Sequence, residues 1–377
     1  MMKKAWLVPI SMLLFAILLA GCSTAESQGG NGSGDGPSNE NNLPQEEVIA
    51  EIDRITADIN SGAITEEEGV EQLQSVIPKP HRYPSRNIEY VIAWGEGGGS
   101  DRYARSISRE AEKIMGVRLV PNNMPGGAGE VALAYALSQP SDGYTLYGAI
   151  TSQVINEALG EQPYSFTEDT TFIIRNQGAT EVFWVRDDSE FETWDDVVAA
   201  EENSPGYVKI TGVGGIGDDQ LRVNEINEQL GLNMTYIPSN ASGERVASLL
   251  GGHVHMLHET AGAVADLYAA GEIRPILVPS DEPFEGIDAQ TTGELGLNIS
   301  VGRWRGTNAP GQLEPEVQQY LHNVFYAASN MPDYLQYEEE SWLHIADGYL
   351  NSEDYEKSAK EEMNTLQTML KEMGYLE

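Results

Sequence analysis

The chain has 377 residues, of which 59 are Asp or Glu and 22 are Lys or Arg, so its formal net charge is −37. A negative charge of this size excludes nucleic acid and anionic lipid surfaces as partners, because both would repel it. It also predicts a saline habitat for the host, since salt screens the self-repulsion of so acidic a chain. The single cysteine, Cys22, excludes a disulfide within the chain and a cysteine-based metal site.

The N-terminal residues predict an export signal. Lys3 and Lys4 precede an apolar run over 5–20 that is too short for a stable membrane span. The run ends in Leu19-Ala20-Gly21-Cys22, which resembles the lipobox of bacterial lipoproteins, where the cysteine is lipidated. We therefore expect residues 1–22 to be a lipoprotein signal peptide with its lipobox. The mature protein is expected to be extracytoplasmic and lipid-anchored to the cell membrane through Cys22.

The next two segments separate the anchor from the folded part. Residues 23–42 are rich in Gly, Ser and Asn and carry few apolar side chains, so they predict a flexible tether. Residues 43–78 then place apolar side chains near the helical period, which predicts an N-terminal helical appendage with a break at Ser61-Gly62.

From Tyr83 onward, short β-rich runs alternate with amphipathic helical runs, which is typical of α/β layers with a mostly parallel sheet. The predicted strands cover 88–94, 117–121, 145–149, 172–174, 182–185, 208–210, 234–237, 254–258 and 274–278. A C-terminal amphipathic helix is predicted around 352–373. Some 290 residues exceed one small core, so we expect two lobes.

Three glycine-rich loops follow predicted strands and precede predicted helices, which is where open α/β sheets bind ligands. They cover 94–101, with its helix from about Arg102, then 124–129 and 212–218. Consecutive glycines let a ligand approach the backbone, and the free amides of a helix start can hold a carboxylate. Asp101 is placed to cap the first of these helices.

Other functions fit the sequence less well. The third loop matches G-x-G-x-x-G, but Asp218 would put a negative charge where a dinucleotide pyrophosphate must lie, and no acidic ribose ligand follows the next strand. His253, His255 and His258 cannot converge on a metal from the two faces of one strand. No G-x-S-x-G elbow indicates a hydrolase. A purely adhesive surface protein would leave the glycine loops without a purpose. We expect neither an enzyme nor a bound cofactor or metal.

Several motifs resemble, in order and spacing, those of one known family. They are Tyr83-Pro84-Ser85-Arg86, the loop Gly97-Gly98-Gly99-Ser100-Asp101, the stretch 122–129, Ser141-Asp142-Gly143-Tyr144, the stretches 249–254 and 269–274, and Trp304-Arg305-Gly306. Together they are similar to the tripartite tricarboxylate transporter receptors of the Bug type, over nearly all of the chain from Tyr83.

This resemblance implies a fold and a function. The fold is a two-lobe, periplasmic-binding-protein-like (type II) clamshell, with lobe one over 83–180 plus 279–377 and lobe two over 181–278. The function is that of a solute-binding protein, without catalytic activity, that captures a small organic acid in the interlobe cleft and delivers it to the subunits of an integral membrane permease. We expect a monomer. The alternatives are a receptor for an amino acid or another ligand with a cationic group, and a surface sensor without a transport role.

The residues that the resemblance and the loops assign to the ligand come from several loops and strand ends. They are Trp94, Gly97, Gly98, Gly99, Ser100, Asp101, Gly127, Thr151, Ser152, Gly215, Ile216, Gly217, Asp218, Ser239, Ser242, Glu259 and Arg305. Asp218 stands where the family usually has Ser or Thr, and Arg305 where it usually has an aromatic residue. If Asp218 and Glu96 both face the cleft, a dianionic ligand is repelled unless Arg305 or a cation offsets them.

Overall fold

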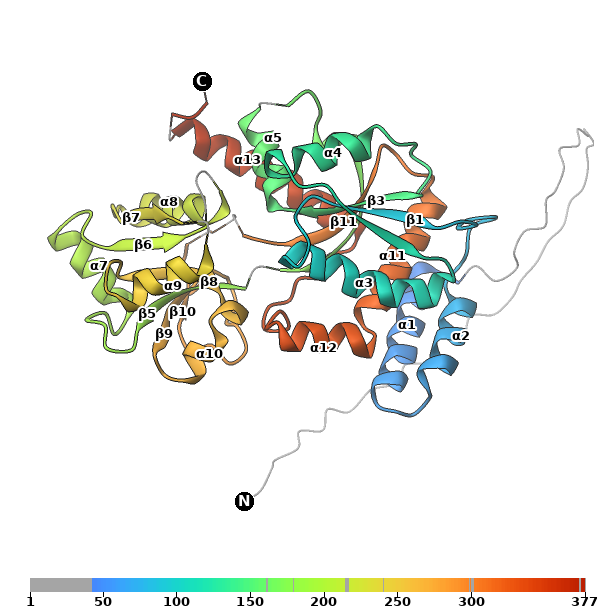
Figure 1. Cartoon of the computed structure of the whole chain (residues 1–377), viewed down its shortest axis with the longest axis horizontal. Coiled ribbons are helices and arrows are strands. Elements are labelled where there is room, and N and C mark those ends of the chain that lie inside the picture. The colour runs from blue at the N-terminus through green and yellow to red at the C-terminus, as the bar shows by residue number, and fades with distance from the viewer. Residues whose placement is uncertain are drawn as a thin grey trace, which may run out of the picture. The chain divides into compact units, whose positions relative to one another are not determined.

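A computed structural model describes residues 43–377, apart from positions 161, 179, 214–216, 240, 298, 300–301, 373 and 377 (Figure 1). The predicted signal peptide with Cys22 and the predicted tether of residues 23–42 lie outside the described residues. No helix in the described part of the chain is long and apolar enough to cross a membrane.

The first described elements are two helices, α1 (Gln45–Asn60) and α2 (Glu66–Val76), which confirm the predicted helical pair. The side chain of Thr65 accepts a hydrogen bond from the Glu68 amide, and the Glu68 carboxylate accepts one from the Thr65 amide, which fixes the start of α2. Their apolar stripe is buried in the same core as the first sheet, through Val48, Ile52, Ile55, Ile59 and Leu73.

Five strands form a first sheet, which we call sheet A. In sheet order they are β2 (Leu119–Asn123), β1 (Ile88–Ile92), β3 (Thr145–Ile150), β11 (Arg305–Pro310) and β4 (Thr170–Gln177). Strand β1 runs parallel to both of its neighbours, whereas β11 runs antiparallel to β3 and β4. The chain therefore returns to sheet A from far along the sequence and inserts β11 between two earlier strands.

Six strands form a second sheet, which we call sheet B. In sheet order they are β10 (Gln290–Thr291), β9 (Ile273–Val278), β5 (Glu181–Arg186), β8 (Met256–Thr260), β6 (Lys209–Gly212) and β7 (Thr235–Pro238). Here β5 is the reversed strand, antiparallel to β8 and β9, while the other pairs are parallel. Strand β10 joins this sheet although it lies beyond residue 278, the boundary expected for lobe two.

The described sheets are mostly parallel, as predicted, and each contains one reversed strand, β11 in sheet A and β5 in sheet B. Strands β5 and β11 are the ones that the chain enters directly from the other sheet. The crossing chain leaves one sheet at the edge where its parallel strands end. It enters the other sheet at the corresponding edge, so its first strand there runs opposite to the parallel strands beside it. Strand β11 was not predicted because its sequence, Arg-Gly-Thr-Asn-Ala-Pro, contains one β-branched residue and ends in proline.

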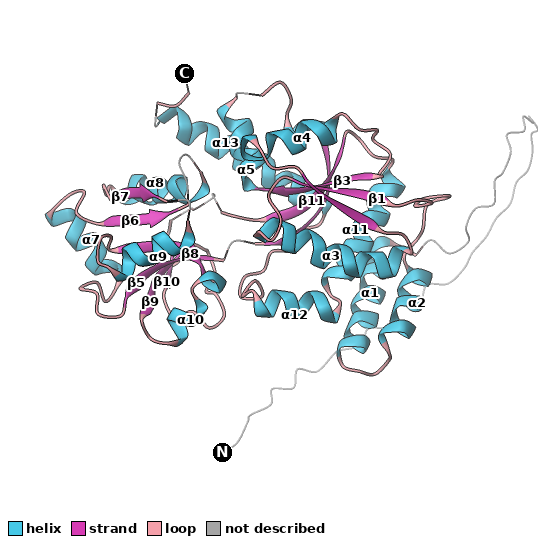
Figure 2. Cartoon of the chain, viewed as in Figure 1, coloured by secondary structure: helices cyan, strands magenta, loops and turns pink. Residues whose placement is uncertain are grey.

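Helices cover both faces of each sheet (Figure 2). Around sheet A they are α3 (Gly99–Met115), the 3-10 turn η1 (Gly127–Gly129), α4 (Glu130–Leu137), α5 (Thr151–Leu159), α6 (Phe166–Asp169), α11 (Pro315–Ser329), α12 (Pro332–Glu340) and α13 (Ser352–Glu372). Around sheet B they are α7 (Trp194–Asn203), α8 (Asp218–Leu230), α9 (Ser242–Leu250), η2 (Ala261–Ala263) and α10 (Ala265–Ala269).

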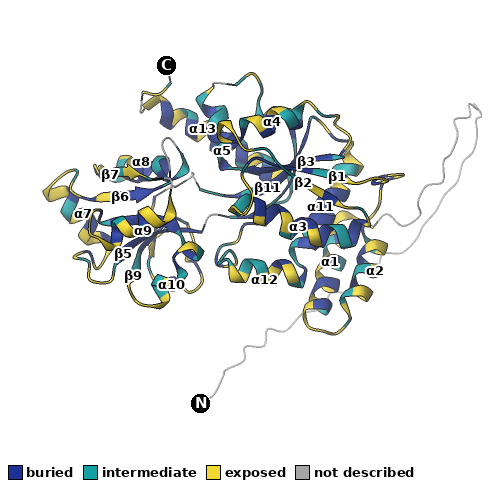
Figure 3. Ribbon diagram, in the orientation of Figure 1, coloured by how far each residue is buried: buried dark blue, intermediate teal, exposed yellow. Residues whose placement is uncertain are grey.

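The apolar strands form the centre of this layered arrangement (Figure 3). Strands β3 and β5 are buried along all but their last residue, as expected for strands covered by helices on both faces. Each sheet has a separate apolar cluster on each of its two faces. The strand interiors are therefore apolar packing. The polar residues that could bind a ligand lie at the strand ends, where the chain crosses between the sheets.

Candidate functional site

The loop after β1 is held in shape by Asp101. Gly97 has a left-handed φ of +76°, which glycine adopts without strain, and its amide donates to Asp101 Oδ2 at 2.9 Å. Arg105 Nε and Asn123 Nδ2 donate to Asp101 Oδ1 at 2.8 and 2.9 Å. Burial opposes the charge of Asp101, but these hydrogen bonds outweigh it and lower the pKa of the carboxyl. Asp101 therefore closes the loop on itself.

The helix that follows begins at Gly99, three residues earlier than expected. Gly99, Ser100 and Asp101 thus form its first turn, where backbone amides have no intrahelical carbonyl to bind. Gly98, the residue before the helix, is exposed, and Gly99 and Ser100 are partly exposed. The sequence predicted free amides at this position, and the structure places them one turn closer to the loop.

Arg305, the first residue of β11, lies against this helix start. An ideal Cβ built on Gly99 would sit 2.4 Å from Arg305 Nη2, so glycine is what allows the guanidinium to approach. Arg305 Nη1 donates to Gln177 Oε1 at 3.1 Å, whereas the buried Nε has no hydrogen-bond partner. Arg305 forms no ion pair with any described residue, and burial lowers the pKa of its guanidinium. A partly buried cation without a counterion among the described residues therefore stands at the positive end of α3.

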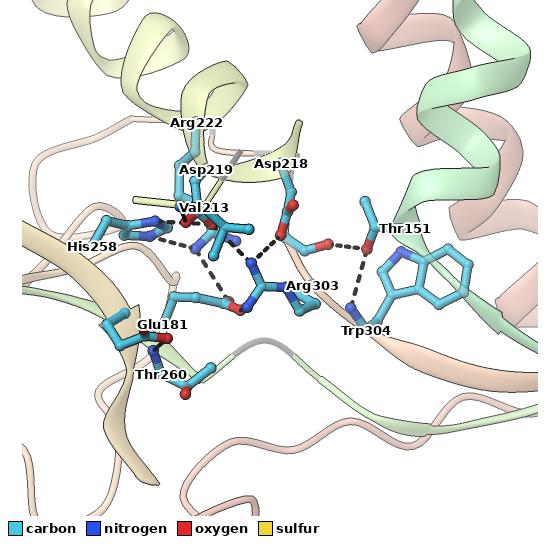
Figure 4. Close-up of polar contacts among 12 residues, drawn as sticks. Thr151, Glu181, Val213, Asp218, Asp219, Arg222, His258, Thr260, Arg303 and Trp304 are labelled. Carbon is cyan, nitrogen blue, oxygen red and sulfur yellow. Dashed lines mark hydrogen bonds and ion pairs between the residues drawn. The ribbon is translucent and has the colours of Figure 1, made fainter. Parts of the chain in front are cut away.

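Arg303, two residues earlier, has the opposite surroundings (Figure 4). Its guanidinium nitrogens lie 3.1 Å from Glu181 Oε1, 2.9 Å from Asp218 Oδ2 and 3.0 Å from Asp219 Oδ1. Glu181 begins β5, and the two aspartates begin α8, so one side chain from the returning segment binds two elements of sheet B. Burial alone would lower the pKa of the Arg303 guanidinium, but the three carboxylates outweigh this effect and raise that pKa.

The same cluster extends deeper into sheet B. Arg222 Nη1 lies 3.4 Å from Glu181 Oε2 and 3.1 Å from His258 Nε2, and Asp219 Oδ2 accepts a 2.7 Å hydrogen bond from the Val213 amide. Burial alone would raise the pKa of Asp219, but His258 and Arg303 outweigh it and lower that pKa. Burial raises the pKa of Asp218, and the neighbouring Asp219 and Glu181 add to the effect. Arg303 opposes this rise in the pKa of Asp218, which nevertheless remains less firmly ionised than Asp219.

Thr151 fixes the segment between the two sheets. Its hydroxyl donates to the Gly302 carbonyl, and its oxygen accepts a 3.1 Å hydrogen bond from the Trp304 amide (Figure 4). Thr151 is the first residue of α5, so the segment around Arg303 is bound to sheet A through Thr151 and to sheet B through Arg303. Thr151 is buried and fully used in this role.

The remaining predicted residues lie in several surroundings. Ser239 donates to Glu244 at 3.0 Å, and Ser242 donates at 3.2 Å to Glu259, which also pairs with the buried Arg245. Ser152 donates to the Ala128 carbonyl, beside Gly127 in η1. The Trp94 carbonyl accepts from Asn123, and its buried indole Nε1 has no partner.

These contacts bear on a condition that the sequence left open, namely which cation offsets Asp218 and whether Glu96 contributes its charge. The cation that pairs with Asp218 is Arg303, not Arg305, because Arg305 turns to α3 and Gln177. Glu96 is exposed on its loop, so water screens its charge. Gly217 precedes α8 with an extended backbone, while Gly215 and Ile216 lie outside the described residues.

Sequence reasoning missed the residues of the buried charge cluster. Glu181, Asp219, Arg222 and His258 are each at most 1% exposed by side chain, and nothing in the sequence marks them as neighbours. One signal was available in Arg303-Trp304-Arg305, where strand-like alternation puts both arginines on one side. Trp304 points the other way, to Glu362 and to a cavity of about 360 Å³ that contains none of the predicted ligand residues.

Comparisons with known proteins assign the chain to a receptor family. A sequence model of the tripartite tricarboxylate transporter family receptors matches residues 103–375. The chain belongs to this receptor family. A UPF0065 protein from the gbd 5' region of Cupriavidus necator is 27% identical over 301 residues, which cover 78% of this chain and 89% of the relative. The family consists of receptors, so the chain is a receptor and not an enzyme.

Solved structures confirm the two-lobe α/β fold of the receptor. A TctC solute-binding protein from Polaromonas superposes with a TM-score of 0.70 at 21% identity, covering 77% of this chain and 99% of that one. The R. palustris protein Rpa4515, solved with adipate, superposes with a TM-score of 0.62 at 21% identity, over 78% and 98% of the two chains. Each sheet with its helices is therefore one lobe of a solute-binding fold, and receptors of this family act outside the cytoplasm.

Proposed function

We propose that this receptor captures a small organic acid, whose carboxylate binds at the start of α3 beside Arg305, and delivers it to a membrane permease of the tripartite tricarboxylate type. The observation that carries the proposal is the partly buried guanidinium of Arg305, which has no carboxylate partner among the described residues and whose buried Nε has no hydrogen-bond partner. The adipate bound to the Rpa4515 structure is consistent with a ligand of this class.

Arg305 and the start of α3 have two unfavourable features that a bound anion would relieve together. A buried cation without a counterion loses hydration and gains no compensating ion pair. The start of α3 adds partial positive charge, which repels the same guanidinium. A carboxylate between them would accept hydrogen bonds from the free amides of Gly99 and Ser100 and from the guanidinium.

The second wall of the proposed site is the start of α8 in the other lobe. Gly215, Ile216 and Gly217 would offer amides there, with Asp218 at the first helical position. Ser239, Ser242 and Glu259 follow from lobe two and Ser152 from lobe one, while the predicted ligand residue Thr151 would act by positioning the segment that carries Arg305. In the proposed division, lobe one is 83–180 plus 279–377 without β10, lobe two is 181–278 together with β10, and ligand binding draws them together.

A screen of ligands tests the function directly. We expect the thermal midpoint of the purified protein, in molar salt, to rise with at least one acid from a panel of mono-, di- and tricarboxylates. Ligand at a hundred times its dissociation constant adds roughly 2.7 kcal/mol to the free energy of unfolding. Gly98→Val should abolish the rise and keep the fold, because a Cβ at Gly98 meets only the Gly95 carbonyl at 3.4 Å. An unshifted midpoint with every acid would contradict the function.

The anchor and the partner are proposals from the sequence and the family. Lipidation at Cys22 and a tether over residues 23–42 would hold a monomeric receptor at the membrane beside the permease. Cys22→Ser should release the protein from the membrane fraction, since the tether offers no other anchor. A variant that stays membrane-bound after a salt wash would overturn the lipid anchor.

A further inference from the structure

Arg303 and Arg305 face the same region with opposite charge balances. Alternation along the extended segment puts their side chains on one side and Trp304 on the other. The contacts agree, because Arg303 reaches α8, Arg305 reaches α3, and Trp304 donates to Glu362 in another direction. Two residues of extended chain span roughly 7 Å, so the two side chains leave the backbone about one small molecule's length apart.

The end of this region at α8 carries an excess of negative charge. Three carboxylates, those of Glu181, Asp218 and Asp219, lie around two guanidinium groups, those of Arg303 and Arg222, and His258 Nδ1 lies 3.2 Å from Asp219 Oδ1. The side chains of Glu181 and Asp219 are 1% exposed, whereas that of Asp218 is 20% exposed. Asp218 is therefore the member of the cluster that a ligand can reach.

The end at α3 carries the opposite excess. Arg305 has no ion pair within the described residues, and its buried Nε lacks a hydrogen-bond partner. A second buried donor without a partner, Asn176 Nδ2, lies next to Gln177 on β4 in a side chain that is 8% exposed. Hydrogen-bond donors therefore outnumber acceptors around Arg305 at the start of α3, whereas acceptors outnumber donors around Asp218.

We propose that the ligand is a small zwitterion, such as an amino acid, whose carboxylate binds Arg305 and the start of α3 while its ammonium group binds Asp218. The inference rests on the proposed function and narrows its ligand class. A dicarboxylate of the same length would place its second charge against Asp218 and be repelled. A ligand with opposite charges at its two ends compensates both excesses at once.

Matched ligand pairs test the inference by isothermal titration calorimetry in molar salt. The panel holds the twenty amino acids and short ω-amino acids, each beside the acid that lacks the ammonium and the dicarboxylate of equal length. We expect at least one zwitterion to bind about tenfold or more tightly than both of its partners, the size of one charged hydrogen bond. Acid binding without preference for the ammonium overturns the inference and leaves the proposed function standing. Binding of neither class overturns both.

Two variants with matched controls locate the two charges. Asp218→Asn should weaken the zwitterion about tenfold and strengthen the dicarboxylate, whereas Arg305→Gln should weaken both. The controls are Asp195→Asn, an exposed carboxylate in the first turn of α7, and Arg109→Gln, an exposed arginine of α3. Neither control should change any affinity. Equal losses of affinity for the zwitterion and the dicarboxylate in Asp218→Asn would show that Asp218 does not bind the ammonium group, and would overturn the inference.

Discussion

Arg303 and Arg305 stand two residues apart on one side of the same segment, yet the fold treats them differently. Three carboxylates from lobe two surround Arg303, so its charge is part of the structure that joins the segment to sheet B. Arg305 has a glutamine, a glycine and a helix start around it, all of which leave its charge unbalanced. Burial of a charged side chain does not by itself identify its role, because the role depends on the groups that pair with it. A charged side chain without such a partner indicates a ligand site.

The largest expected effect comes from breaking the paired arginine. Arg303→Gln removes the cation shared by Glu181, Asp218 and Asp219 and leaves Glu181 to Arg222 and Asp219 to His258, which should cost up to about 3–5 kcal/mol in the free energy of unfolding. Arg305→Gln removes a cation that has no counterion, so stability should stay within about 1 kcal/mol or increase. Urea denaturation of both variants beside Arg109→Gln measures the contrast. Similar losses in the two variants would refute the distinction between structural and ligand-binding arginine.

The next effect concerns affinity rather than stability. Gly99→Ala places a Cβ 2.4 Å from Arg305 Nη2, and the free end of the guanidinium must swing away. Acid binding should weaken about tenfold to a hundredfold, as expected when a charged hydrogen bond is lost, while the unfolding midpoint changes little. Calorimetric titration gives the affinity. Gly243→Ala is the control, since nothing lies within 4 Å of its added Cβ. Unchanged affinity in Gly99→Ala would mean that Arg305 does not contact the ligand.

A third prediction extends the comparison to the residue between the two arginines. Trp304 donates to Glu362, and burial raises the pKa of this carboxyl from 4.5 to about 8, against the opposing effects of Trp304 and Arg175. The native state then keeps a proton that the unfolded state releases, so stability falls as pH rises from about 4.5 towards 8. Glu362→Gln should match the parent at pH 5 and exceed it by more than about 1 kcal/mol at pH 9. Parallel stability curves would contradict this assignment.

The smallest effect concerns the surface as a whole. Removal of residues 1–21, which include Lys3 and Lys4, would leave 20 basic and 59 acidic residues, a net charge of −39. The thermal midpoint should rise by several degrees between about 0.1 and 1 M NaCl, as the Debye length falls from about 10 to 3 Å. An equal concentration of sucrose serves as the uncharged control. A midpoint indifferent to NaCl would remove the argument for a saline habitat.

The sequence predicted the strands of both sheets well because apolar runs such as those of β1, β3 and β5 carry their own signal. It did not predict β11, which has the composition of a loop and becomes a strand only between β3 and β4. Tertiary pairing decides such a segment, and local propensity does not.

The predicted ligand residues show the same limit. The free amides at Gly99 and Ser100 follow from a glycine-rich loop before a helix, so pattern reasoning finds them. The partner of Asp218 could not be found in this way, because Arg303 lies 85 residues further along and reaches it only after the chain has crossed between the lobes. Contacts between distant segments determine which charges are balanced, and the balance at Arg305 is a property of the fold.

A crystal structure of the protein with the acid or amino acid that most raises its thermal midpoint tests the central claim most directly. We expect a ligand carboxylate within hydrogen-bonding distance of Arg305 and of the Gly99 or Ser100 amide, with Arg303 still paired to Asp219 and Glu181. A ligand bound away from the start of α3, or an Arg305 that contacts only protein in the complex, would contradict the account.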